Sequence, residues 1–127
     1  MQMPWRLTEV PNPFYGEHQR PWNDLPPGSY WTIPLIDLEE KEKTWLSVRP
    51  LSPEFYASGR DYVTWITLPG GAEWSPDFLS SESHQGWVTT GTLPTITVQP
   101  SVHQIGRYHG YIINGEVTDD LEGRTYD

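Results

Sequence analysis

Hydrophobic and polar residues alternate over short segments of this chain, and the alternation predicts β-strands. The clearest strand spans 61–68, and Pro69-Gly70-Gly71 turns it towards a returning strand at 72–74, as in a β-hairpin. β-Branched and aromatic residues predict further strands at 30–33, 44–48, 86–90 and 95–99. No window has the period of a long amphipathic helix, and the charged segment 37–43 is expected to be a solvated loop.

The last hairpin can be assigned a register. Asn114-Gly115 is a strong two-residue turn signal between strands at 108–113 and 116–118, and it places Ile112 opposite Val117 and His109 opposite Asp120. The residues expected on the core face are Tyr108, Ile112, Val117 and Leu121. The residues expected on the other face are His109, Tyr111, Thr118 and Asp120.

Strands at roughly ten-residue spacing, separated by glycine and proline, predict an all-β fold. We expect one antiparallel domain over residues 29–127, either a sandwich or a small barrel. The whole chain has 127 residues, which is close to the commonest size of a single domain.

Residues 1–28 have a different composition, with six of the 13 prolines of the chain. This spacing disfavours helices and central strands, so we predict an extended arm without regular secondary structure. Disordered tails are poor in aromatic residues, whereas this segment contains Trp5, Phe14, Tyr15 and Trp22. These side chains are therefore expected to lie on an apolar surface, either of the same domain or of a neighbouring subunit.

The charge of the chain limits its partners. With 17 acidic and 8 basic residues the formal net charge is −9, which disfavours direct binding to nucleic acid or to anionic membranes and favours a basic protein surface or simple solubility. Cysteine is absent, and no apolar run is long enough to span a bilayer. We therefore expect the cytoplasm, of a cell or of an infected host.

Candidate chemistry is sparse. A histidine opposite a carboxylate, as expected for His109 and Asp120, is the start of an acid–base pair but also an ordinary cross-strand ion pair. Asp119 and Glu122, together with His103, could add metal ligands, but the spacing matches no named metal motif and we predict no metal site. There is no glycine-rich phosphate loop and no nucleophile elbow, so no cofactor is predicted and nothing argues for catalysis.

One segment resembles a known family. Within 86–124, the motifs Pro100-Ser101-Val102, Tyr108-His109-Gly110-Tyr111, Asn114-Gly115 and Gly123-Arg124 are similar to those of a domain of unknown function in small proteins of tailed phages and prophages. Many members have cysteine beside the histidine, which implies metal binding in those proteins. Here Tyr108 stands at that position, so only His109 carries over. The candidate binding residues are His109, Asp120, Tyr111, Trp87 and Arg107.

These observations favour a phage-encoded, non-enzymatic accessory protein that acts by protein–protein binding. A virion-associated, assembly or decoration component is the first expectation, with the protein as a homo-oligomer or as part of a larger assembly in the virion or the host cytoplasm. Its partner would be a phage structural protein or a host protein. Two alternatives remain open: an acidic inhibitor of a host defence protein, which could mimic nucleic acid, and a β module that binds a small ligand.

Overall fold

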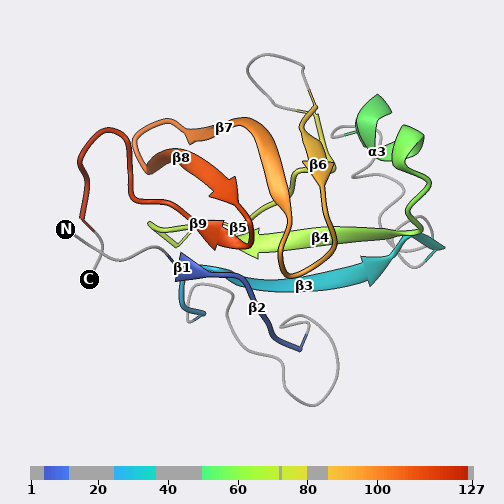
Figure 1. Ribbon diagram of the computed structural model, residues 1–127, viewed down its shortest axis with the longest axis horizontal. Helices are drawn as coiled ribbons and strands as arrows, with labels where there is room; N and C mark the ends of the chain where they lie inside the picture. The colour runs from blue at the N-terminus through green and yellow to red at the C-terminus, as the bar shows by residue number, and fades with distance from the viewer. Residues whose placement is uncertain (1–4, 12–24, 37–49, 72, 80–85, 126–127) are drawn as a thin grey trace.

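The computed structural model describes residues 5–11, 25–36, 50–71, 73–79 and 86–125, and these form two β-sheets and a short helix (Figure 1). The five-stranded sheet has, in spatial order, β1 (Trp5–Arg6), β9 (Glu116–Val117), β8 (Tyr108–Ile113), β7 (Thr97–Gln104) and β6 (Val88–Thr90). The four-stranded sheet has β2 (Thr8–Glu9), β3 (Ser29–Pro34), β4 (Tyr62–Thr67) and β5 (Glu73–Trp74). The all-β prediction is confirmed as a sandwich, because the two sheets do not close into a barrel.

The predicted hairpins are present. β4 and β5 pair in antiparallel fashion around Pro69-Gly70-Gly71, and β8 and β9 pair around Asn114-Gly115, where both turn residues have positive φ. β7 is longer than expected and carries an irregularity between Val98 and Val102, where β7 holds two more residues than the facing segment of β8. The predicted strand at 44–48 and the charged segment 37–43 lie outside the described residues.

The described part of the N-terminal segment corrects the arm prediction. Residues 5–9 contain two short strands, and β1 pairs with β9 while β2 pairs in parallel with β3, so they belong to the same domain as the rest of the chain. Leu7 lies between these strands with 5% of its surface exposed, and Trp5 packs against the same core. Phe14, Tyr15 and Trp22 lie outside the described residues.

The four-stranded sheet is buried on both faces. Towards the five-stranded sheet it contributes Tyr30, Ile66 and Trp74 to a core that includes Val98, Val102, Tyr108, Ile112 and Val117. On its other face Trp31 and Val63 pack with Phe55 of the helix α3 (Pro53–Ser58) and with Phe78, which follows β5 and forms a bridge with Leu51. The second face of the five-stranded sheet has no such covering core among the described residues, and we call it the open face.

The helix α3 was not predicted, because its six residues are too short to show an amphipathic period. Its local signals are nevertheless present in the sequence. Ser52 accepts a hydrogen bond from the Phe55 N–H as N-cap, Pro53 begins the helix, and Gly59 ends it in the left-handed conformation.

Candidate functional site

The polar cluster that the sequence indicated lies on the open face of the five-stranded sheet. Its residues come from the C-terminal part of the chain. The register of β8 and β9 is confirmed, with Ile112 opposite Val117. The Thr118 N–H donates to the Tyr111 carbonyl, as that register requires. The same register predicts that the Asp120 N–H donates to the His109 carbonyl, but the donor there is the Leu121 N–H. One extra residue is therefore accommodated between the two bonds, as in a β-bulge.

This one-residue slip reverses two predicted positions. A shift by one residue turns every later side chain to the opposite face of a sheet. Asp120, expected on the open face, is buried, whereas Leu121, expected in the core, is 56% exposed. The predictions for these two residues were wrong for this reason, while Tyr108, Ile112 and Val117 are in the core as predicted.

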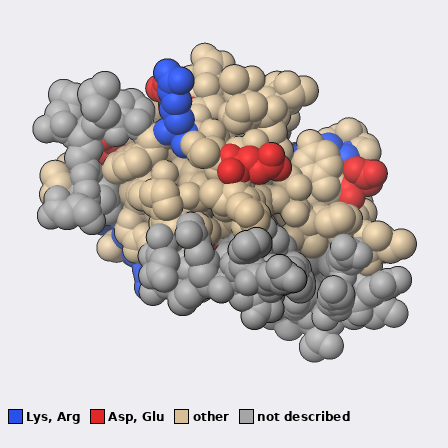
Figure 2. All heavy atoms as spheres, turned by 90° about the horizontal axis from the view of Figure 1, so that it is seen from below, with Lys and Arg blue, Asp and Glu red and all other residues tan. Residues whose placement is uncertain are grey.

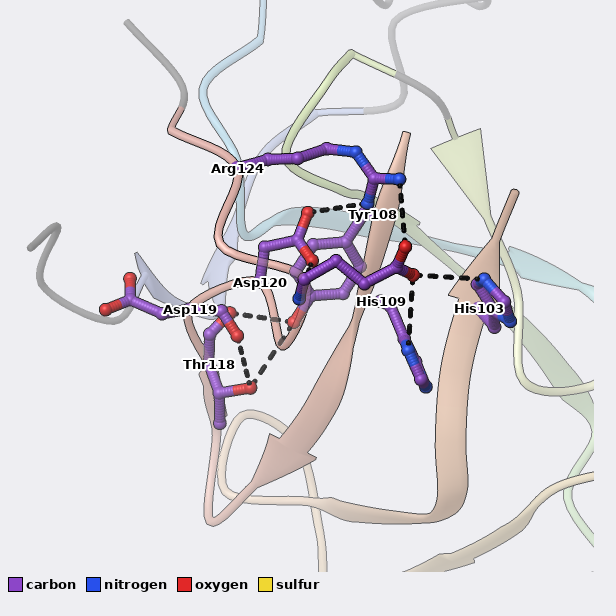
Figure 3. A network of polar contacts seen from close by, with 8 residues as sticks. His103, Tyr108, His109, Thr118, Asp119, Asp120 and Arg124 are labelled. Carbon is purple, nitrogen blue, oxygen red and sulfur yellow. Dashed lines mark hydrogen bonds and ion pairs between the residues drawn. The ribbon is translucent and has the colours of Figure 1, made fainter. Parts of the chain in front are cut away.

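The carboxylate that contacts His109 is that of Glu122 rather than the predicted Asp120. Glu122 Oε2 lies 3.4 Å from His109 Nδ1 and 3.4 Å from His103 Nε2 (Figure 3). The two histidines face each other directly across β7 and β8, and their rings stack with centroids 4.3 Å apart and an interplanar angle of 21°. The other nitrogen of His109, Nε2, lies 3.3 Å from Ser101 Oγ.

Asp120 has a structural role in this cluster. Its buried carboxylate accepts from the Glu122 backbone N–H at 2.7 Å and from Arg124 Nη1 at 2.9 Å. The second nitrogen of the Arg124 guanidinium lies 3.3 Å from Glu122 Oε1. Arg124 thus joins the two carboxylates, and Asp120 fixes the turn from which Glu122 reaches the histidines (Figure 3).

On the core side of the hairpin, the Tyr108 hydroxyl donates to the Thr118 carbonyl at 2.8 Å. Burial raises the pKa of Tyr108 to about 12, and the carboxylates of Asp120 and Asp119 add to that rise. Tyr108 is therefore neutral at any physiological pH, and its ring is a fixed support for the hairpin rather than an acid or a base.

The other predicted site residues are dispersed. Tyr111 is half-exposed on the open face, next to the histidine cluster. Trp87 is partly buried and packs against the core, where its ring meets that of Trp74 edge to face at 5.0 Å and its Nε1–H donates to the Ser101 carbonyl. Arg107 lies exposed in the turn between β7 and β8, where its backbone N–H donates to the Gln104 carbonyl.

The sequence pattern indicated His103 and Glu122 only as possible additional metal ligands and not as partners of His109. The signal that could have placed His103 is its spacing from His109 around a turn containing Gly106, which has a φ of +78° and lets β7 and β8 form a hairpin with a three-residue loop. The position of Glu122 depends on the register slip and could not be inferred from spacing.

A second polar feature lies away from the open face. The buried Asp77 carboxylate accepts from the Thr64 N–H at 2.9 Å and lies 2.8 Å from Arg60 Nη2. Burial raises the pKa of Asp77, although the Thr64 hydrogen bond and the Arg60 charge act to lower it. Because the Asp77 backbone carbonyl also accepts from Ser52, this residue joins the helix cap to β4 and has a structural role.

Arg60 also borders a cleft of about 260 Å³ between β4 and the segment around Leu93. The cleft is lined by hydroxyl groups and by Ile96, and Tyr62 is its aromatic residue. Pockets for drug-sized ligands are typically about 300–1,000 Å³. This cleft is smaller than that range.

Comparisons of the chain with protein-family models, with curated proteins and with solved structures found no match. Within the described part of the chain, no helix has the length and apolar character required to cross a membrane.

Proposed function

We propose that this chain is a phage-encoded, non-enzymatic accessory protein that binds another protein through the open face of its five-stranded sheet. The observation that carries the proposal is the presence of three exposed apolar side chains on that face. Val88, Tyr111 and Ile113 are 53%, 39% and 45% exposed, and they lie on β6 and β8, the two neighbours of β7. Grouped exposed apolar residues, unlike isolated ones, are typical of interaction sites.

The strand register explains why these residues share one face. Val98 points into the core and is opposite both Thr89 on β6 and Ile112 on β8. Side chains alternate along a strand, so the residues on either side of these positions face outwards. Tyr111 and Ile113 flank Ile112, and Val88 precedes Thr89, so these three side chains share the open face with Gln99, which is opposite Val88, and with the His103–His109 pair.

Within this proposal, a virion-associated or assembly role comes first. The proposal of a phage origin rests on the resemblance of the motifs within residues 86–124 to those of small phage and prophage proteins. The described part of the N-terminal segment pairs within its own domain, so the support for assembly comes from the open sheet face rather than from a swapped arm. The virion or the host cytoplasm is the proposed location, and a phage structural protein is the proposed partner.

An acidic inhibitor of a host defence protein is the second candidate, favoured by the net charge of −9. A nucleic-acid mimic would present acidic groups in a continuous strip. On the face shown in Figure 2, the acidic side chains of the described residues lie in separate small groups. That face does not supply such a strip, so this candidate remains second.

The test is incorporation into phage particles. Virions purified from the phage that encodes this chain should contain the polypeptide by mass spectrometry. A Val88→Lys/Ile113→Lys variant should be lost from particles, because it replaces two apolar side chains of the open face by charged ones. Tyr56→Lys is the matched control, because Tyr56 is 62% exposed but lies on α3. Absence of the wild-type chain from virions, or equal incorporation of all variants, would contradict the proposal.

A further inference from the structure

The cluster on the open face brings two imidazoles and a carboxylate together. We propose that His103, His109 and Glu122 form a binding site for a single divalent transition-metal ion. One ligand atom from each residue lies within 4.8 Å of both others, and Glu122 Oε2 contacts His103 Nε2 and His109 Nδ1. They come from β7, from β8 and from the turn that follows β9, so the fold rather than sequence proximity brings them together.

The distances suit a tetrahedral ion. With zinc–ligand bonds of about 2.0–2.1 Å, two ligands of a tetrahedral site lie about 3.3–3.4 Å apart. Both His–Glu contacts measure 3.4 Å. The stacked imidazole rings do not yet direct both lone pairs at one point, so binding requires the ring of His103 to rotate. Its side chain is 41% exposed and has room to do so.

The type of ligand selects the type of metal. Two imidazoles and one carboxylate favour zinc and its neighbours in the first transition row, whereas magnesium and calcium prefer sites made of oxygen ligands. Three protein ligands leave a fourth position, which faces solvent because the site lies on the open face. Water or a donor from a partner would complete the coordination.

The surroundings orient the ligands as outer-shell groups do in known metal sites. Arg124 contacts Glu122 Oε1 and leaves Oε2 towards the histidines. Asp120 is buried beside Arg124 and offsets its charge, so the negative charge of Glu122 remains available to a cation.

Ser101 orients the ring of His109 as Arg124 orients the carboxylate of Glu122. In the tautomer with a proton on Nε2, His109 donates to Ser101 Oγ and turns the Nδ1 lone pair towards the carboxylate of Glu122. In the other tautomer, His109 Nδ1–H donates to Glu122 Oε2 and the Ser101 hydroxyl donates to Nε2, so the same contacts are satisfied without a metal ion. A metal-free, purely hydrogen-bonded cluster is therefore the competing explanation that an experiment must exclude.

The experiment is isothermal titration calorimetry of the full chain with zinc, after removal of metal by a chelator. The wild type should bind one equivalent, and magnesium and calcium should not compete. His103→Ala, His109→Ala and Glu122→Gln should each weaken zinc binding by more than about 100-fold, which exceeds the roughly 10–100-fold typical of outer-shell changes. Cobalt should give the intense visible absorption of a tetrahedral site.

Two control variants separate this site from adventitious binding. The chain has four histidines, so a His18→Ala/His84→Ala variant keeps the proposed ligands and should bind zinc like the wild type. Asp119→Asn removes a nearby carboxylate that is not a proposed ligand and should also bind normally. Thermal melting of each variant without metal shows whether it is folded. No binding by the wild type, or loss of binding in the His18/His84 variant alone, would overturn the proposal.

Discussion

Gly115 is the position where the structure makes its sharpest prediction. It is the second residue of the β8–β9 turn, with a φ of +80°, and its N–H donates to the Ile96 carbonyl while its own carbonyl accepts from the Leu7 N–H, both at 2.8 Å. A Cβ added here would overlap the Pro94 carbonyl oxygen. The Gly115→Ala variant must therefore adopt a strained backbone and also displace the segment that leads into β7.

The loss of stability in Gly115→Ala has two parts, the strained backbone and the displaced neighbour. The Gly106→Ala variant, as a control, measures the first part alone. Gly106 has a φ of +78° in the β7–β8 turn, but an added Cβ there meets nothing within 4 Å. The left-handed conformation costs an alanine about 1–2 kcal/mol, so Gly106→Ala should lose about that much stability. Displacing packed backbone adds about 1–3 kcal/mol, which brings the loss for Gly115→Ala to about 2–5 kcal/mol.

Thermal and urea unfolding would measure both variants. For a domain of this size, 1 kcal/mol corresponds to about 4 °C in melting temperature. We expect a fall of about 4–8 °C for Gly106→Ala and about 8–20 °C for Gly115→Ala. If the two variants lose the same stability within about 0.5 kcal/mol, the contact between the hairpin turn and Pro94 is not formed and the argument fails.

Two further predictions concern the core and a buried charge. Leu7→Ala should lower the free energy of unfolding by about 2–5 kcal/mol in urea titrations, because Leu7 fills the core between the sheets; a loss below about 0.5 kcal/mol would mean that the first strands do not dock there. The raised pKa of Asp77 predicts a stabilising contribution that is complete below its ordinary value of 3.8 and is lost as the pH rises through the folded value. The stability of the wild type relative to Asp77→Asn should therefore decrease as the pH rises above 3.8, and an increase would show that Arg60 outweighs burial.

The sequence predicted those parts of the fold whose signals are local. Alternating apolar residues identified β4 and β8, and turn residues identified both hairpins, because strand pattern and turn chemistry act over a few neighbouring positions. The strands at Trp5–Arg6 and Thr8–Glu9 were missed because each has two residues, and these form only where β9 and β3 offer an edge. The candidate site was predicted in part: His109 was identified, but its partner depended on a register change with no local signal.

That register change conflicts with the hydrophobic pattern, so polar contacts must account for it. The regular register would bury Leu121, and burial of a leucine side chain is worth about 1.5–3 kcal/mol. The observed register exposes Leu121 and buries Asp120, which accepts two hydrogen bonds, one of them from the Arg124 guanidinium. Hydrogen bonds to charged groups contribute about 1.5–3 kcal/mol each, so two of them can exceed the hydrophobic gain that is lost. The result is a turn that holds Glu122 over His103 and His109, so the polar contacts of Asp120 that override the hydrophobic pattern also position one ligand of the proposed metal site.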